Sequence, residues 1–282
     1  MGAARDGMTL GIFSKTFRRD GVEEVMAAVR ASGVTTTAFN FTCAGFDDLP
    51  EEVPEAALAA IRGAAGRAGV RIDCVSGTFN MAHPDRGHRE GGLRRFATAV
   101  RAAPLLGASQ VNICTGTRDT GHMWHWHAGN DDPAAWRDMA GTVAAALELA
   151  EAAGVDLLVE PETGNVINSP QRASRLVDEM ASPRLKIIVD VANMTEPGDE
   201  ARIPDAIDAT FDLLGPRFAM IHGKDRAADG TVVPAGRGVV PWERLLDRLD
   251  AADFRGPFII HGVDEAGASE SIAWFRGLGI GR

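Results

Sequence analysis

The chain has 282 residues, of which 45% are hydrophobic and 24% charged, so it can build a large core and does not have the composition of a disordered protein. Its formal net charge of −10 at pH 7 repels phosphate backbones and anionic lipid surfaces, so we expect neither nucleic-acid binding nor membrane binding. Cys43, Cys74 and Cys114 form no closely spaced pair, and no apolar segment has the length of a signal peptide or a membrane span, which predicts a cytoplasmic protein with free thiols.

Short β-rich segments alternate with helical segments along the whole chain, without a linker. The strand candidates are residues 8–14, 35–41, 71–77, 110–116, 156–162, 185–191, 218–224 and 257–263. The helical segments include residues 21–32, 54–68, 133–154, 240–252 and 269–279, with apolar residues three and four apart. Eight such units in about 250 residues are typical of a closed barrel, so we predict a single-domain α/β protein, a (β/α)8 TIM barrel spanning residues 1–282. An open doubly wound sheet is disfavoured because no glycine-rich phosphate turn follows the first strand.

Side chains at the carboxyl ends of barrel strands line the active site. In each of the last four strands, a run of apolar residues is followed by one residue whose side chain can bind a metal. These side chains are Glu160, Asp190, His222 and His261. Their separations of 30, 32 and 39 residues each correspond to one strand and helix, so we expect them to converge. A single polar strand end is more often a loop cap, but four at equivalent places predict a divalent-metal site with positions left for substrate oxygens.

Several motifs resemble those of the xylose-isomerase-like barrel superfamily of sugar phosphate isomerases and epimerases. The motifs are SGTFNMAHPD, VEPETGN, VDVAN, IHGKD and AGRG, and the resemblance covers nearly the whole chain. Members typically bind Mn, Mg, Co or Zn through a glutamate, an aspartate, a histidine and a second glutamate at the ends of strands five to eight. The resemblance therefore implies Glu160, Asp190 and His222 as ligands. His261 stands where the second glutamate is usual, and Asn193 stands where many members have a histidine.

The resemblance implies a divalent-metal-dependent isomerase or epimerase that acts on a ketose, a sugar phosphate or a related polyol through an enediolate. A cation chelated by adjacent hydroxyl and carbonyl oxygens acidifies the hydrogen on the carbon between them. An isomerase can use one base, whereas an epimerase needs proton-transfer groups on both faces, and both are glutamates in the epimerases of the family. With His261 in one of these places, isomerisation is favoured. If His261 binds the cation, Mn is preferred over Mg, with Co or Zn as further candidates; an unbound His261 could instead serve as acid or base.

Other interpretations stay open. The same enolate could expel a leaving group, which would make the protein a metal-dependent lyase or dehydratase acting on a ketosugar or inosose. A non-catalytic barrel that binds a sugar would explain the departures at Asn193 and His261. An abasic-site nuclease of the superfamily is disfavoured by the seven histidines and the negative net charge.

Further side chains are candidates for roles at this site. Glu162 and Lys224 lie two positions beyond Glu160 and His222 and so face the same side of a continuing strand, where they could transfer a proton or stabilise an oxyanion, or form a rim salt bridge. His83 could reach the substrate from its loop or cap a turn. Arg237, between the glycines of AGRG, could orient a substrate group or lie exposed in a flexible turn. Asn193 is a further candidate for substrate binding.

The segment that follows the fourth strand is long and contains HMWHWH at residues 122–127. Aromatic rings stack on the apolar faces of sugars, and histidines can bond hydroxyl groups, so we expect Trp124, His125 and Trp126 to bind a carbohydrate substrate, as a lid or wall over the site. The alternative is a subunit interface in a homo-oligomer, because tryptophan is also enriched there.

Overall fold

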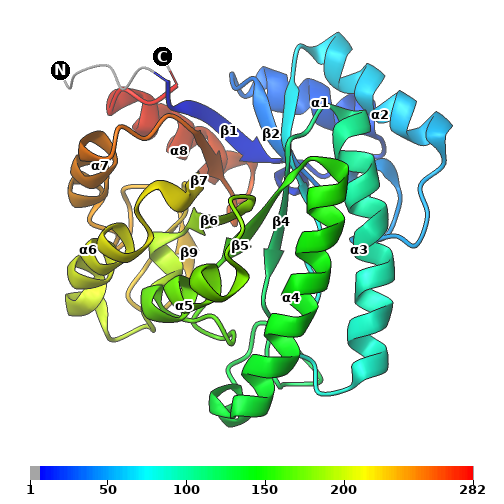
Figure 1. Cartoon of the computed structure of the whole chain (residues 1–282). Helices are drawn as coiled ribbons and strands as arrows, with labels where there is room; N and C mark the ends of the chain where they lie inside the picture. The colour runs from blue at the N-terminus through cyan, green and yellow to red at the C-terminus, as the bar shows by residue number, and fades with distance from the viewer. Residues whose placement is uncertain (1–6, 282) are drawn as a thin grey trace.

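Eight parallel strands close into a barrel in the computed structural model, which describes residues 7–281 (Figure 1). The barrel strands are β1 (Thr9–Phe13), β2 (Thr36–Phe39), β3 (Arg71–Ser76), β4 (Gln110–Cys114), β5 (Asp156–Glu160), β6 (Leu185–Val189), β7 (Phe218–His222) and β10 (Pro257–Ile260). They are hydrogen-bonded in the order β1-β10-β7-β6-β5-β4-β3-β2, and β1 pairs with β2 to close the ring. The predicted (β/α)8 barrel is therefore confirmed, with every predicted strand in it.

Within residues 7–281, eight α-helices surround the barrel (Figure 1). They are α1 (Val22–Ala31), α2 (Glu55–Ala68), α3 (Arg86–Leu106), α4 (Pro133–Ala153), α5 (Pro170–Met180), α6 (Ile203–Leu214), α7 (Trp242–Ala251) and α8 (Glu265–Gly277). The two longest, α3 and α4, lie side by side, and Asp138 of α4 forms ion pairs with Arg89 of α3 and with Arg118 of the preceding loop. Every helix within residues 7–281 is too short or too polar to cross a membrane.

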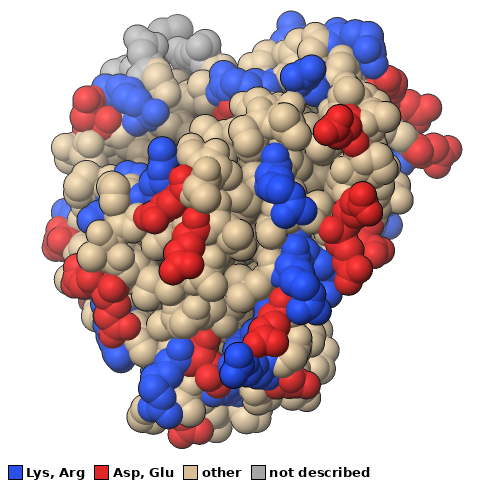
Figure 2. All heavy atoms as spheres, turned by 45° about the vertical axis from the view of Figure 1, so that its right-hand side comes forward, with Lys and Arg blue, Asp and Glu red and all other residues tan. Residues whose placement is uncertain are grey.

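The surface that includes these helices carries both signs of charge. Figure 2 shows lysine and arginine side chains interspersed with aspartate and glutamate on the face it presents. Ion pairs such as Arg86–Glu90 within α3 account for part of this alternation. Such exposed pairs contribute little to stability, so the fold depends mainly on its buried apolar layers.

The inside of the barrel has its own apolar core, distinct from the larger one between strands and helices. It is formed by Ala38, Cys74, Leu158, Ile188, Met220 and Ile259. Because side chains alternate along a strand, the residue two positions later points to the same axis. On the last four barrel strands that next inward position is Glu160, Asp190, His222 or His261. The apolar layer therefore lies directly below these four polar side chains along the barrel axis.

A small antiparallel hairpin follows β7 and was not predicted. Its strands, β8 (Asp225–Arg226) and β9 (Val232–Val233), have two residues each, too few for a recognisable alternation. The Asp225 side chain is fully buried. Its carboxylate accepts hydrogen bonds from the backbone amides of Arg226, Gly236, Gly238 and Val240 and from the Trp242 indole. The loop that contains AGRG is therefore wrapped around this carboxylate.

Candidate active site

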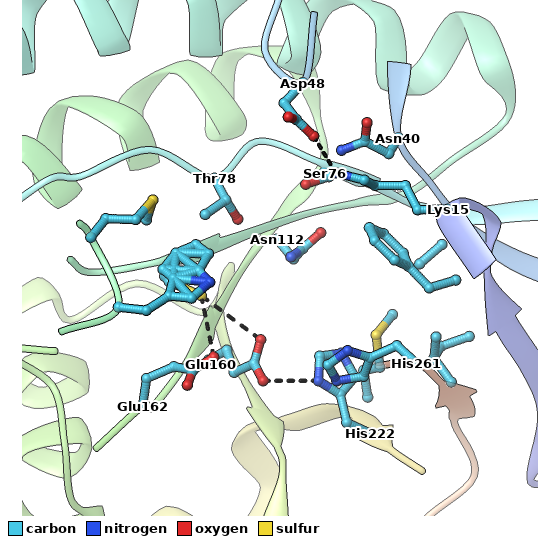
Figure 3. Close-up of a pocket in the computed structure, with 17 residues that line it drawn as sticks. Lys15, Asn40, Asp48, Ser76, Thr78, Asn112, Glu160, Glu162, His222 and His261 are labelled. Carbon is cyan, nitrogen blue, oxygen red and sulfur yellow. Dashed lines mark hydrogen bonds and ion pairs between the residues drawn. The ribbon is translucent and has the colours of Figure 1, made fainter. Parts of the chain in front are cut away.

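Four side chains that can bind a metal meet at the carboxyl end of the barrel. One ligand atom from each of Glu160, Asp190, His222 and His261 lies within 4.8 Å of the others. The His222 Nδ1 atom is 2.9 Å from Glu160 Oε1 and 3.5 Å from Asp190 Oδ2, and His261 Nε2 is 3.2 Å from Asp190 Oδ2. The first three residues are buried and His261 is partly exposed. Figure 3 shows Glu160 facing His222. The structure thus brings together all four residues that the strand ends indicated.

The donor set and its supports fit a divalent cation. Two carboxylates and two imidazoles suit Mn, Co or Zn, which accept both oxygen and nitrogen ligands. The Asn193 amide donates to Glu160 Oε1 and to Asp190 Oδ2, at 3.2 Å each, and accepts from Lys224 Nζ at 2.6 Å. Outer contacts of this kind orient metal ligands. The structure therefore places Asn193, a predicted substrate-binding residue, against the carboxylates of Glu160 and Asp190 and outside the lining of the main cavity.

The buried charges perturb one another strongly. Burial alone would lower the pKa of His222, but Glu160 and the hydrogen bond with Asp190 outweigh it and raise the pKa to about 10. Burial opposes ionisation of Asp190, yet the charge of Lys224 and the hydrogen bonds with His222 and His261 hold its pKa well below the usual range. Burial and the neighbouring His222 lower the pKa of His261. Without a cation, His222 therefore carries the proton of the imidazole pair.

Glu162 and Lys224 stand beside this cluster in different protonation states. Burial, followed by the charge of Glu160, raises the pKa of Glu162 to about 8, so its carboxyl group holds a proton at neutral pH. Burial would lower the pKa of Lys224, but Asp190, Glu162 and Glu160 outweigh it and raise the pKa. The Lys224 ammonium lies 3.5 Å from Asp190 Oδ2. Glu162 can thus donate a proton, and Lys224 supplies a fixed positive charge.

A cavity of about 400 Å³ opens over the cluster. Glu160, Glu162, His222 and His261 lie on one side of it, with Phe13, Met123 and Trp124 among its apolar side chains. The other side carries Lys15, Asn40, Asp48, Ser76, Thr78 and Asn112 (Figure 3). This polar group was not predicted, because its members are not metal-binding side chains at the ends of the last four strands. The same strand-end rule, applied to β2 and β3, points to Asn40 and Ser76.

The loop of residues 115–132 contributes part of the cavity wall. Trp124 lines the cavity, whereas His125 and Trp126 do not. Buried Asn165 donates to the Met123 carbonyl oxygen at 3.1 Å, and a Cβ atom on Gly164 would lie 2.0 Å from the Trp124 carbonyl oxygen. The loop after β5 therefore fixes the backbone beside Trp124. Of the three predicted sugar-binding residues in HMWHWH, the structure brings only Trp124 to the cavity.

Two other candidates lie outside the cavity lining. The His83 ring stacks on His88 with centroids 4.0 Å apart, and its Nδ1 atom accepts from the Asp85 amide. The Arg237 side chain is 72% exposed and forms an ion pair with Glu270, 3.6 Å from Nε to Oε2. Both therefore have protein partners away from the metal-binding cluster.

Comparison with known proteins supports the same architecture. The sequence profile of the xylose isomerase-like TIM barrel family matches residues 26–278. No curated protein matches the sequence. Among solved structures, the chain is similar to 3-keto-D-glucoside 4-epimerase from E. coli, with a TM-score of 0.73, 17% identity, and coverage of 96% of this chain and 99% of that one. D-psicose 3-epimerase from Clostridium cellulolyticum H10, solved with D-tagatose, gives a TM-score of 0.75, 17% identity, and coverage of 96% and 99%.

A third similar structure contains a cation. It is a xylose isomerase-like TIM barrel protein from Mycobacterium smegmatis in complex with magnesium, with a TM-score of 0.72, 14% identity, and coverage of 98% of each chain. At these identities the structural likeness demonstrates the fold.

Proposed function

The chain belongs to the xylose isomerase-like TIM barrel family, and we propose from this premise that it is a divalent-metal-dependent isomerase of a ketose or related sugar. The observation that carries the proposal is the convergence of Glu160, Asp190, His222 and His261 at the wall of one cavity. Mn is the preferred cation because half of the ligand atoms are imidazole nitrogens. The sugar epimerases among the similar structures favour a carbohydrate substrate.

A bound cation would supply a Lewis acid for the carbonyl oxygen of the substrate and offset the negative charge of the enediolate. The protein's own part is proton transfer. Glu160 Oε2 and Glu162 Oε1 lie 3.8 Å and 3.9 Å from the same atom, Cys114 Sγ, so both carboxyl groups lie on one side of the cavity. Burial and these two neighbours raise the pKa of Cys114 well above its usual value, so it stays a thiol. Proton transfer on one face suffices for isomerisation, whereas epimerisation needs both faces.

Elimination from a ketosugar or inosose is the second candidate. Glu162 lines the cavity beside Glu160 and could protonate a leaving group on the carbon next to the enediolate. The product distinguishes the two reactions, because elimination yields an unsaturated compound or its tautomer and isomerisation conserves composition.

The test starts with the metal content of protein purified without chelator. We expect about one Mn, Co or Zn ion per chain, with much lower content in Glu160→Ala and His222→Ala. His88→Ala, on α3 and outside the cavity, is the control and should keep the metal. Unchanged metal content in both cluster variants would refute the site.

The second step uses Mn-loaded protein with ketoses, 3-ketoglycosides and inososes in heavy water. Deuterium incorporation at the carbon next to the carbonyl, together with a product of the same composition, is the expected result. A fully metal-loaded protein that exchanges no proton in any of these compounds would support a sugar-binding barrel without catalysis.

A further inference from the structure

Three polar side chains from the neighbouring strands β2, β3 and β4 line the cavity with unused hydrogen-bonding groups. Asn40 directly follows β2, Ser76 is the last residue of β3, and Asn112 is the middle residue of β4. Asn40 is 3% exposed, and its Oδ1 atom accepts from the Thr42 amide at 3.0 Å and from the Thr42 hydroxyl at 2.7 Å. This arrangement turns the Asn40 amino group toward the cavity, where it has no hydrogen-bond partner within residues 7–281. The hydroxyl group of Ser76, a residue 8% exposed, likewise has none among the described residues.

Asn112 repeats this arrangement on the neighbouring strand. Its Oδ1 atom accepts from Cys74 Sγ at 3.5 Å, and its amino group has no partner in the described part of the chain. Amide and hydroxyl groups that border a cavity and have no protein partner can donate hydrogen bonds to a ligand that enters it. Donors collected at one end of a cavity therefore point to a ligand with several oxygen atoms.

An ion pair completes this end of the cavity. Lys15, in the turn after β1, donates to Asp48 Oδ1 at 2.6 Å across 33 positions of sequence. The pair offers both donors and acceptors while its charges cancel. Within residues 7–281, Lys15 carries the one ammonium group in the cavity lining, and Asp48 already neutralises it. A phosphate ester would therefore have neither an unpaired ammonium group nor an arginine in this lining to bind it.

We infer that Asn40, Ser76, Asn112 and the Lys15–Asp48 pair form a hydroxyl-binding subsite that selects an unphosphorylated sugar or polyol. The inference rests on the proposed function, in which the carbonyl end of the substrate lies at the metal-binding cluster. The amino groups bind hydroxyl oxygens, and Asp48 accepts from a hydroxyl hydrogen. Phe13 and Trp124, which also line the cavity, contact the carbon skeleton of the sugar.

The test measures binding rather than turnover, by calorimetry on Mn-loaded protein. The probes are D-fructose, D-tagatose and an inosose, each compared with its phosphate monoester. At least one neutral compound should bind about tenfold more tightly than its ester, a difference of about 1.4 kcal/mol. Tighter binding of the esters would overturn the subsite.

Variants of Asn40 and Asp48 test whether these residues cause the preference for neutral compounds over phosphate esters. Asn40→Asp keeps the Oδ1 acceptor for Thr42 but replaces the donor that faces the cavity, so neutral compounds should bind about tenfold more weakly at unchanged metal content. Asp48→Asn leaves the positive charge of Lys15 unbalanced and should therefore reduce the difference in affinity between the neutral compound and its phosphate ester. Asp212→Asn, in the exposed pair with Arg248, is the matched control and should change neither quantity. Unaltered binding in Asn40→Asp would refute the assignment.

Metal content separates failure of the subsite from failure of the proposed function. If the protein holds about one Mn per chain but binds no neutral probe, the subsite is wrong and the metal site stands. If the protein binds no metal, the proposed function fails, and the same titration on metal-free protein then tests the subsite alone. Neutral-compound binding that Asn40→Asp weakens supports the subsite in that case, and its absence overturns it.

Discussion

Cation binding to the cluster of Glu160, Asp190, His222 and His261 should release a proton from His222. The carboxylates raise the pKa of His222 to about 10 in the metal-free protein, so a cation must displace the proton to reach the imidazole. At pH 7.5 the displacement covers about 2.5 pH units and costs about 3.4 kcal/mol. The apparent affinity for Mn should therefore increase about tenfold per pH unit between pH 6.5 and 8.5.

Isothermal titration in buffers of different ionisation enthalpy measures the proton directly. We expect release of about one proton per cation at pH 7.5. The variant His222→Gln, which has no titrating imidazole, should bind more weakly and lose this proton release. An affinity that stays constant from pH 6.5 to 8.5 in the native protein would refute the reasoning.

The same groups set the stability of the metal-free protein. The raised pKa of His222 adds stability that is complete below about 6.5 and disappears as the pH rises through about 10. The raised pKa of Glu162 acts in the same direction, with its contribution complete below about 4.5 and lost through about 8. The melting temperature without metal should therefore fall between pH 6.5 and 8. Stabilisation by Mn should increase over the same interval, and a metal-free melting temperature that rises would contradict both assignments.

Three further predictions concern Trp124 in the cavity lining, Asp225 in the fold and His261 in the candidate metal site. Trp124→Ala should weaken the binding of neutral sugars about tenfold at constant metal content, whereas Trp126→Ala, at a residue outside the cavity lining, should leave it unchanged. Equal effects of the two variants in calorimetry would refute the role of Trp124 in sugar binding. Asp225→Ala removes an acceptor of five hydrogen bonds and should lower the free energy of unfolding by about 3–5 kcal/mol in urea titrations; a loss below about 1 kcal/mol would be incompatible with this role. His261→Glu should keep metal and proton exchange, and His261→Ala should weaken metal binding. Full occupancy without exchange in His261→Ala would instead make His261 an acid or base outside the metal shell.

The barrel and the convergence of Glu160, Asp190, His222 and His261 could be predicted because both follow from the period of two along a strand. An apolar run fixes the strand, and its inward positions lead from Leu158 to Glu160 and from Met220 to His222. Loop residues obey no such rule. The direction of His83 depends on its stacking with His88, and the position of Arg237 depends on a loop that folds around Asp225. These contacts involve loop conformations that periodicity does not specify.

The polar residues on the other side of the cavity could not be predicted from the sequence, for a different reason. Asn40 and Ser76 occupy strand ends that the sequence identifies, but asparagine and serine are also common turn and cap residues. Whether such a side chain can bind a ligand depends on which of its atoms already have hydrogen-bond partners in the protein, and this cannot be read from the sequence. The Lys15–Asp48 pair likewise depends on two loops meeting in space. Residue type and position predict a metal ligand better than they predict a hydroxyl-binding group.

The histidine at position 261 changes which side of the cavity holds the carboxyl groups. The resemblance implies a glutamate after the last strand, where this chain has a neutral imidazole, but the chain also has a carboxyl group at Glu162. Glu162 and Glu160 share Cys114 as a neighbour, so the proton-transfer groups gather on the β5 side. Asp190, the remaining carboxylate, has a fully buried side chain occupied by its contacts with His222, His261 and Lys224. Epimerisation at this site would therefore require His261 as the second proton-transfer group, whereas isomerisation requires only the carboxyl groups beside β5.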